Sequence, residues 1–238
     1  MAGLIGKIIR HIITGDIFSL VHEKIVCYAK SKYYTLRYCK SKKGGGGIIF
    51  HSSNIKLHIN LQKNSNFIVG HKLILQSFLN AGGDINISIG QGGICAFEND
   101  FILGANIKIS VSDNATLTFG GKNLESGSGI TESCIIMCYK KITIGKDFIC
   151  SWNTYITDCD WHSISIDGRN CSSYEDVVIG NHVWIGSNVI IGKGSVLEDN
   201  VIIGAFSKIS NRTITGRGIT AGTPPRLLKE NVQWQRDL

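Results

Sequence analysis

The 238-residue sequence contains no long uninterrupted apolar segment, although 43% of its residues are hydrophobic. The most apolar stretch near the N-terminus is broken by Lys7 and Arg10, so no segment reaches the roughly 18 residues that a transmembrane helix needs. The same stretch does not resemble a signal peptide. We therefore expect a protein of the cytoplasm that does not span the membrane.

Paired cysteines and clustered metal ligands are also missing. The eight cysteines are scattered without a C-x-x-C pair. Cys134 and Cys138 are four residues apart, but no histidine lies near them to complete a zinc site. We expect no metal, and cysteines that act as small buried hydrophobic residues in a reducing compartment.

What the chain does contain is a repeat, because an aliphatic residue returns every six positions near the C-terminus. These residues are Ile179, Ile185, Ile191, Leu197, Ile203 and Ile209. A period of six fits neither the α-helix nor a simple strand, but it is the repeat of a β-helix in which each hexad forms one face. Glycine follows four of the six and is expected to let the chain turn a corner. Stacked coils of three hexads would place Ile179 on Leu197, Ile185 on Ile203 and Ile191 on Ile209.

The repeat is interrupted before Ile179. The same phase occurs at Ile144, Cys150 and Ile156, but 23 residues separate Ile156 from Ile179, which is not a multiple of six. Residues 158–177 are polar and lack the repeat, so they are predicted to leave the coil as an inserted loop. Insertions of this kind form binding surfaces in repeat proteins.

These patterns divide the chain into three parts. Short β-rich pieces before residue 144 extend the β-helix, which we predict over residues 48–222. Residues 1–43 form a basic helical segment, and residues 223–238 form a short closing segment. The predicted fold is mainly β.

Acidic residues are scarce in the first 43 residues, which contain nine basic and two acidic residues and therefore carry the net charge of the whole chain, +7. Apolar residues at spacings of three and four predict an amphipathic helix over residues 3–13, and a second helix is expected from 17 to about 38. Three interpretations stay open: packing within the protein or its trimer, contact with an anionic membrane surface, and nucleic-acid binding. No nucleic-acid motif accompanies the charge, so we expect no nucleic-acid partner.

The inserted loop begins with the string D-C-D-W-H-S-I. In an extended chain, Asp158, Asp160 and His162 would point to one side. Cys159 and Trp161 would point to the other. A neutral imidazole can take a proton from a hydroxyl group, and a neighbouring carboxylate can fix its tautomer. The sequence does not decide which aspartate would do so.

Four strings accompany the hexads: D-C-D-W-H-S-I, V-W-I-G-S, I-G-A and A-G-T-P-P-R, the last of which holds the only two prolines of the chain. Over roughly residues 144–234 the chain resembles the hexapeptide-repeat acyltransferases, particularly the branch that O-acetylates bacterial surface polysaccharides. That resemblance implies a left-handed parallel β-helix, a homotrimer, and acetyl-CoA as co-substrate. It also implies an active site in the cleft between adjacent β-helices.

The resemblance also implies roles for individual residues. His162 would be the general base, with Asp160 beside it, and Asp158 and Trp161 would lie on the acceptor side. The residues expected to bind acetyl-CoA are Trp184, Ser187, Ala205, Ser210, Asn211, Thr223, Pro224, Arg226 and Lys229. Three positions depart from the family pattern, since Asn211 replaces a common lysine, Thr223 a common asparagine and Phe206 a usual glycine. The donor to the oxyanion is not identified.

The predicted function is therefore O-acetylation of a bacterial surface glycan, of the capsule or lipopolysaccharide O-antigen type, by a cytoplasmic enzyme. Peripheral contact with the inner face of the cytoplasmic membrane stays open. Alternatives are a sugar-nucleotide or small-molecule acetyltransferase and a non-catalytic β-helical scaffold. A zinc-dependent carbonic anhydrase is disfavoured, because only His162 and His182 lie among well-formed hexads. Acylation of Cys159 is disfavoured because that side chain is predicted to point away from His162.

Overall fold

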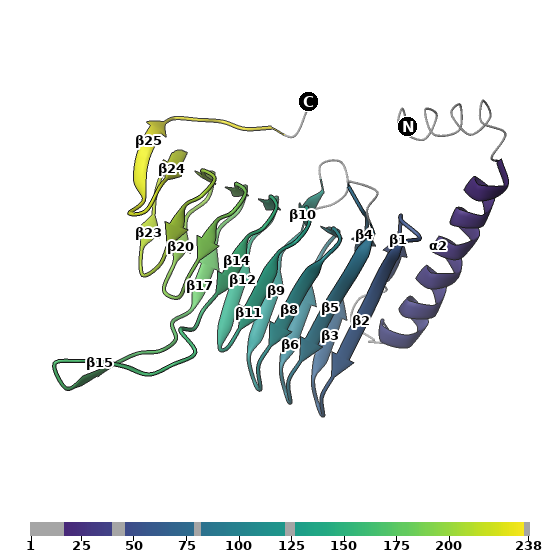
Figure 1. Cartoon of the computed structure of the whole chain (residues 1–238), viewed down its shortest axis with the longest axis horizontal. Coiled ribbons are helices and arrows are strands. Elements are labelled where there is room, and N and C mark those ends of the chain that lie inside the picture. Colours follow the sequence, from purple (N-terminus) through teal and green to yellow (C-terminus); the bar gives the residue numbers. More distant parts are fainter. Residues whose placement is uncertain (1–16, 40–45, 79–81, 122–126, 236–238) are drawn as a thin grey trace.

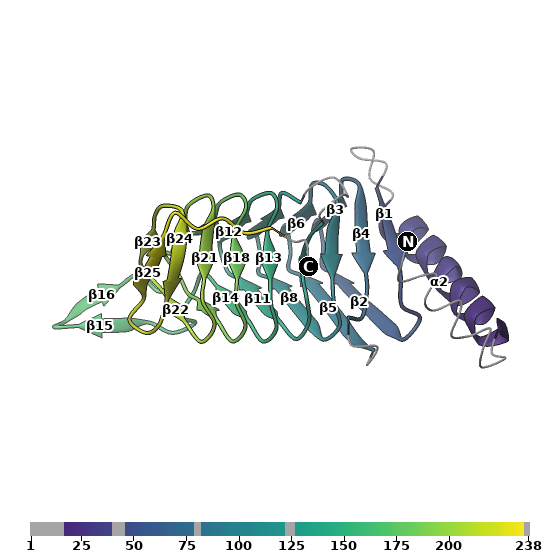
Figure 2. The ribbon, with the colours of Figure 1, turned by 90° about the horizontal axis from the view of Figure 1, so that it is seen from above.

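The computed structural model describes residues 17–39, 46–78, 82–121 and 127–235, and shows an elongated three-sided prism (Figures 1 and 2). The prism is a left-handed parallel β-helix with a helical segment at its N-terminal end and a short tail at its C-terminal end. The predicted fold class is confirmed. The helix predicted over residues 3–13 lies outside the described residues.

Three parallel sheets form the faces of the prism. Face A consists of β1 (Gly47–Phe50), β4 (Lys72–Leu75), β7 (Phe101–Leu103), β10 (Ser128–Ile130), β13 (Ile149–Cys150), β18 (Trp184–Ile185), β21 (Val201–Ile203) and β24 (Gly218–Ala221), followed by the antiparallel β25 (Arg226–Glu230). Face B consists of β2 (Ile55–Leu61), β5 (Gly83–Ile89), β8 (Ile107–Val111), β11 (Ile135–Cys138), β14 (Tyr155–Thr157), β19 (Ile190–Ile191) and β22 (Lys208–Ile209). Face C consists of β3 (Asn66–Val69), β6 (Ile94–Phe97), β9 (Thr116–Phe119), β12 (Lys141–Ile144), β17 (Val177–Ile179), β20 (Val196–Leu197) and β23 (Thr213–Ile214).

The hexad register is the one that the sequence predicts. Ile179 pairs with Leu197, Ile185 with Ile203, and Ile191 with Ile209. All six side chains are buried in the interior of the prism. Each buried aliphatic side chain stabilises the fold by about 1.5–3 kcal/mol, so these three ladders hold the C-terminal coils together.

The glycines after the aliphatic residues serve a different purpose from the predicted one. Gly180 and Gly186 do not have positive φ angles. Instead, a Cβ atom at Gly180 would lie 2.8 Å from the backbone nitrogen of Asp199 on the next coil. Glycine is required there by the close approach of stacked coils. Left-handed corners are formed largely by asparagines, such as Asn188 with a φ angle of 57°.

The interrupted repeat corresponds to an inserted loop, as predicted. After β14 the chain leaves the edge between faces B and C, forms the antiparallel hairpin β15 (Ile164–Ile166) and β16 (Arg169–Cys171), and returns to the coil at β17. A bridge between Cys159 and Tyr174 closes the base of the loop. Figure 1 shows the hairpin projecting away from the prism near its C-terminal end.

The helix α2 (Ile17–Tyr38) has the predicted bounds and lies across the N-terminal end of the prism (Figure 1). Ser31 Oγ accepts a hydrogen bond from the Phe50 backbone N–H at 2.9 Å, and Thr35 Oγ1 accepts one from the Ile48 N–H at 2.9 Å. These contacts satisfy backbone groups on the open edge of β1, which would otherwise invite pairing with another chain. Among the described residues, no helix is long and apolar enough to cross a membrane.

The C-terminal segment closes the other end. After pairing with β24, the chain turns back along the prism (Figure 1). Trp234 is buried and its ring stacks on that of His182, with the ring centroids 4.1 Å apart. This contact fixes the tail to the edge between faces C and A.

Candidate active site

Asp158, at the start of the inserted loop, is fully buried. Its Oδ1 atom accepts a hydrogen bond from the backbone N–H of Tyr139 at 2.6 Å. Its Oδ2 atom accepts two more, from Lys140 at 2.8 Å and Lys141 at 2.7 Å. The carboxylate therefore holds the turn between β11 and β12 together. The predicted position of Asp158 on the acceptor side is not what the structure shows, because solvent cannot reach this group.

The predicted alternation of side chains along the start of the loop is also wrong. Asp158 and the following Cys159 are both buried, whereas an extended strand would place them on opposite sides. Trp161 has a left-handed backbone with a φ angle of 65°, and its N–H contacts Cys159 Sγ at 3.2 Å. A sharp turn at the base of the loop replaces the extended segment. The buried Cys159 thiol is poorly placed to act as a nucleophile.

His162 is exposed on the inserted loop, beyond the turn at Trp161. Within the part of the chain that the structure describes, its imidazole makes no hydrogen bond with Asp158 or Asp160. The ring is therefore accessible to a substrate hydroxyl. Neither aspartate fixes its tautomer in the single chain.

Asp160 is held by a lysine that the sequence analysis did not identify. Lys193, on the next coil, is buried, and its Nζ atom lies 2.6 Å from Asp160 Oδ2. The same ammonium group donates a hydrogen bond to the backbone carbonyl of Ser172, at the other end of the loop. Lys193 thus joins the outgoing and returning strands of the loop. The available sequence signal was a lysine inside an apolar hexad, one coil beyond an acidic loop.

Three aromatic side chains surround the base of the loop. The rings of Tyr139 and Trp161 meet edge to face with their centroids 5.8 Å apart. The ring centroids of Tyr139 and Tyr174 are 5.3 Å apart. All three are about 40% exposed. Lys140 lies over the Tyr174 ring, and its hydrogen bond to Asp176 raises the pKa of its ammonium group. Tyr139 and Tyr174 could not be placed here from sequence, because the loop geometry brings them together.

The residues expected to bind acetyl-CoA fall into separate groups on one chain. Ser187 and Ala205 occupy the edge between faces A and B on successive coils, and the Phe206 N–H donates to the Ser187 carbonyl at 3.0 Å. Thr223 continues this column beyond β24, and Pro224 follows it through a cis peptide bond.

The remaining predicted residues lie elsewhere. Ser210 and Asn211 are on the edge between faces B and C, where the Asn211 N–H bonds to the Lys193 carbonyl at 2.8 Å. Arg226 and Lys229 are exposed on β25. Trp184 is exposed on face A, with its Nε1 atom 3.5 Å from Ser151 Oγ. A single chain therefore does not bring Trp184 together with His162.

A second histidine with a carboxylate partner lies on the edge between faces C and A. His182 Nδ1 is 2.7 Å from Asp147 Oδ2. One face of this ring is covered by Trp234, whose Nε1 atom donates to the His182 carbonyl at 3.3 Å. These contacts assign His182 to the attachment of the tail.

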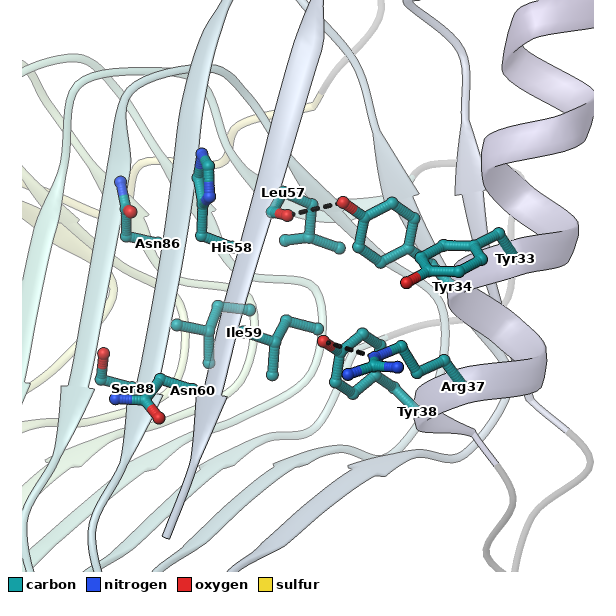
Figure 3. Close-up of a pocket in the computed structure, with 11 residues that line it drawn as sticks. Tyr33, Tyr34, Arg37, Tyr38, Leu57, His58, Ile59, Asn60, Asn86 and Ser88 are labelled. Atoms are coloured by element: carbon teal, nitrogen blue, oxygen red, sulfur yellow. Dashed lines mark hydrogen bonds between the residues drawn. The ribbon is translucent and has the colours of Figure 1, made fainter.

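A groove at the opposite end of the prism lies between α2 and the first two strands of face B (Figure 3). Its walls include Tyr33, Arg37 and Tyr38 from the helix, and His58 and Asn86 from the strands. Four strand spacings, about 19 Å at 4.8 Å each, separate β2 from β14, where the inserted loop begins. The groove is thus separate from the candidate active site. Among the described residues, no cluster of three or more potential metal ligands is present.

Comparison with known proteins agrees with this architecture. The family described as "Bacterial transferase hexapeptide (six repeats)" matches residues 176–211. The polysialic acid O-acetyltransferase of Neisseria meningitidis is 35% identical over 155 residues, which are 64% of this chain and 70% of that protein. An uncharacterized 24.8 kDa protein in the cps region of Klebsiella pneumoniae is 32% identical over 184 residues, covering 76% of this chain and 77% of that protein.

Two solved structures are also similar. The polysialic acid O-acetyltransferase OatWY matches 77% of this chain and 90% of its own with 23% identity and a TM-score of 0.41. The polySia-specific acetyltransferase NeuO matches 80% and 88% with 21% identity and a TM-score of 0.42. On the strength of the hexads and the two sequence relatives, the chain belongs to the hexapeptide-repeat acyltransferase family, in the branch that contains polysaccharide O-acetyltransferases.

Proposed function

We propose that this protein transfers an acetyl group from acetyl-CoA to a hydroxyl of a bacterial surface glycan, of the capsule or lipopolysaccharide O-antigen type. The observation that carries this proposal is the exposed imidazole of His162, free of intramolecular hydrogen bonds among the described residues, on the loop inserted into a hexapeptide-repeat prism. The relative from Neisseria meningitidis, an O-acetyltransferase of polysialic acid, supports a glycan as acceptor.

In the proposed reaction His162 acts as general base. Its neutral imidazole takes the proton from the acceptor hydroxyl while that oxygen attacks the thioester carbonyl carbon. The new C–O ester bond forms, the C–S bond breaks, and the proton passes from the imidazole to the departing CoA sulfur. Asp160 contributes through its ion pair with Lys193, which holds the loop that carries His162. Holding both groups in reacting geometry supplies much of the acceleration.

The site is proposed to be completed by a second chain in a homotrimer. An outward row on face B runs through Ile135, Tyr155 and Ile190, which are adjacent in register, and the two isoleucines are 38% and 40% exposed. The same row is polar near the N-terminus, at Asn86 and Lys108. The row becomes charged again at Lys208, which follows Ile190 in register. Adjacent exposed apolar side chains bounded by polar ones favour burial against another copy.

In that assembly, Trp184 of one chain would lie beside His162 of its neighbour, and acetyl-CoA would occupy the cleft between them. The backbone amides of Ser187 and Ala205 would bind the pantetheine arm, with Ser210 and Asn211 at the turn beside it. Thr223 and Pro224 would lie near the adenine. Arg226 and Lys229 are exposed cations suited to the phosphates.

The decisive experiment incubates the purified protein with labelled acetyl-CoA and a panel of bacterial glycans, nucleotide sugars and serine. Label is expected on a glycan, and His162→Ala is expected to lower the rate about 100-fold to 10,000-fold. CoA at about 100 times its dissociation constant should stabilise both proteins by about 2.7 kcal/mol. His58→Ala, a change at an exposed histidine far from the loop, serves as the control.

Transfer only to nucleotide sugars or serine would replace the glycan by a small acceptor. Full activity of His162→Ala would remove the proposed base. An unshifted melting temperature with CoA, together with no transfer, would favour a non-catalytic scaffold.

A further inference from the structure

Helix α2 has two distinct faces, and only one of them contacts the β-helix. Tyr34 and Tyr38 point toward the first strand of face B (Figure 3), and Tyr34 OH donates to the Leu57 carbonyl at 2.8 Å. Lys30 Nζ donates to the carbonyls of Ser53 and Ile55, at 2.6 and 2.9 Å. This docked face uses its polar groups to cover the end of the prism.

The other face carries large apolar side chains that point into solvent. They are Phe18, Val21, Ile25, Tyr28 and Leu36. Phe18 is 89% exposed and Ile25 61%, and the spacings of three, four and three residues from Phe18 to Tyr28 place them along one side of the helix. From Phe18 to Leu36 this apolar stripe extends about 27 Å. The contacts between α2 and the β-helix do not explain this exposed apolar stripe.

The charge around the apolar stripe is positive. Lys24 and Lys32 are exposed, and Lys32 lies over the Tyr28 ring with its Nζ atom 5.5 Å from the centroid. The one acidic residue of the helix, Glu23, is only partly exposed and lies on the side nearer the β-helix. A helix that is apolar and basic on the same outer side matches an anionic lipid surface, where the rings and aliphatic chains insert and the ammonium groups meet the headgroups.

We infer that the apolar stripe of α2 docks on an anionic lipid bilayer, with the helix lying in the plane of the interface. A second copy of the chain is the competing occupant, but it would bring Lys24 and Lys32 of one helix against those of another without an acidic partner. The lipid surface supplies the missing negative charge. This inference goes beyond acetyl transfer and does not depend on it.

The test is sedimentation of the full chain with vesicles of POPC alone and of POPC with POPG at three to one. Binding is expected to the POPG vesicles, to be weak on POPC, and to decrease as salt is raised, because the charges at the surface are screened. Lys24→Glu with Lys32→Glu is expected to weaken binding about tenfold or more, and Phe18→Ser with Ile25→Ser to abolish it. Leu61→Ser and Lys108→Glu, exposed changes on the β-helix, are the matched controls and should bind like the parent.

Equal binding to both vesicle types, or none to either, would overturn the inference. So would a Phe18→Ser, Ile25→Ser variant that keeps its vesicle binding but falls to a smaller oligomer, since the apolar stripe would then be an interface between copies. The same variant should keep the stabilisation by CoA. Membrane binding and acetyl transfer therefore succeed or fail separately.

Discussion

Two aspartates in the D-C-D-W-H-S-I string have different environments, although they are only two residues apart. Asp158 is buried and accepts three backbone N–H groups. Asp160 is exposed and pairs with Lys193. The residue type alone could not distinguish them, because both carboxylates suit an acidic loop. Because Asp158 is buried, its role is structural.

Replacing Asp158 with alanine should therefore lower the stability of the protein, with a smaller effect on catalysis. Three buried N–H groups would lose their acceptor, at about 1–3 kcal/mol each if no water replaces it, so a loss of about 3 kcal/mol or more is expected. Urea unfolding measures this change. Asp167→Asn, at the exposed hairpin tip, is the control and should leave the unfolding free energy unchanged. An equally stable Asp158→Ala variant would contradict the capping role.

The buried thiols make stability depend on pH. Burial raises the pKa of Cys39 to about 11, and burial also raises the pKa of Cys95, Cys138 and Cys150, with the Asp158 charge adding to the effect at Cys138. Thiols of the unfolded chain ionise near pH 8.5. Above that pH the unfolded state binds fewer protons than the folded state, so the free energy of unfolding falls as pH rises.

We expect the loss from the fully buried Cys95 to be about 1.4 kcal/mol per pH unit above pH 8.5, and to be absent below it. Urea unfolding of the parent and of Cys95→Ala at pH 7.5, 8.5 and 9.5 measures it. The variant should show the shallower decline. Parallel declines in the two proteins would mean that the Cys95 thiol does not contribute.

At the scale of elements, the inserted loop is a separate unit attached to a regular prism. The hairpin of β15 and β16 is exposed throughout, and the contacts that fix its base come from Lys193 and the Cys159–Tyr174 bridge. The coil keeps its register on both sides, since Ile144 pairs with Ile179 across the insertion. The position of the loop is therefore set by a few contacts at its base.

Lys193→Met should increase the mobility of the loop while the coil stays folded. Removing the ammonium group frees Asp160 and the Ser172 carbonyl, so we expect kcat for acetyl transfer to fall about tenfold while KM for acetyl-CoA changes little. Steady-state kinetics separates the two constants, and limited proteolysis should show faster cleavage in the loop. Lys63→Met, at an exposed lysine in the turn between β2 and β3, is the matched control. Unchanged kcat with faster cleavage would limit Lys193 to a structural role.

The whole molecule is a rod with different surfaces along its length. On face B the outward row changes from polar, at Asn86 and Lys108, to apolar, at Ile135, Tyr155 and Ile190. The helix α2 lies at one end and the inserted loop projects near the other (Figure 2). Assembly through the apolar half would leave the N-terminal end free to meet a membrane.

Ile190→Glu is expected to break the proposed homotrimer, because a charge would be buried in the apolar row. Light scattering after size exclusion should show a monomer that has lost acetyl transfer, since each site would lack residues of the second chain. Lys108→Glu, in the polar half of the same row, should stay trimeric. A trimeric and active Ile190→Glu variant would place the interface elsewhere.

The sequence by itself determined the prism, its register and the position of the insertion. A period of six leaves one regular arrangement that buries Ile179, Ile185 and Ile191, and 23 residues cannot fit a multiple of six. The bounds of α2 also followed from local pattern, because apolar spacing and the glycines after it act within a few residues.

Tertiary structure alone decided which side chains of the loop are buried and which are free. The Asp158 carboxylate is buried where it accepts backbone N–H groups from a turn 17 to 19 residues earlier in the chain, and Lys193 contacts the loop from the next coil. The exposed stripe of α2 likewise emerged only once its other face was docked. Local pattern cannot fix such contacts, because they join residues that are distant in sequence and adjacent only after the coils have stacked.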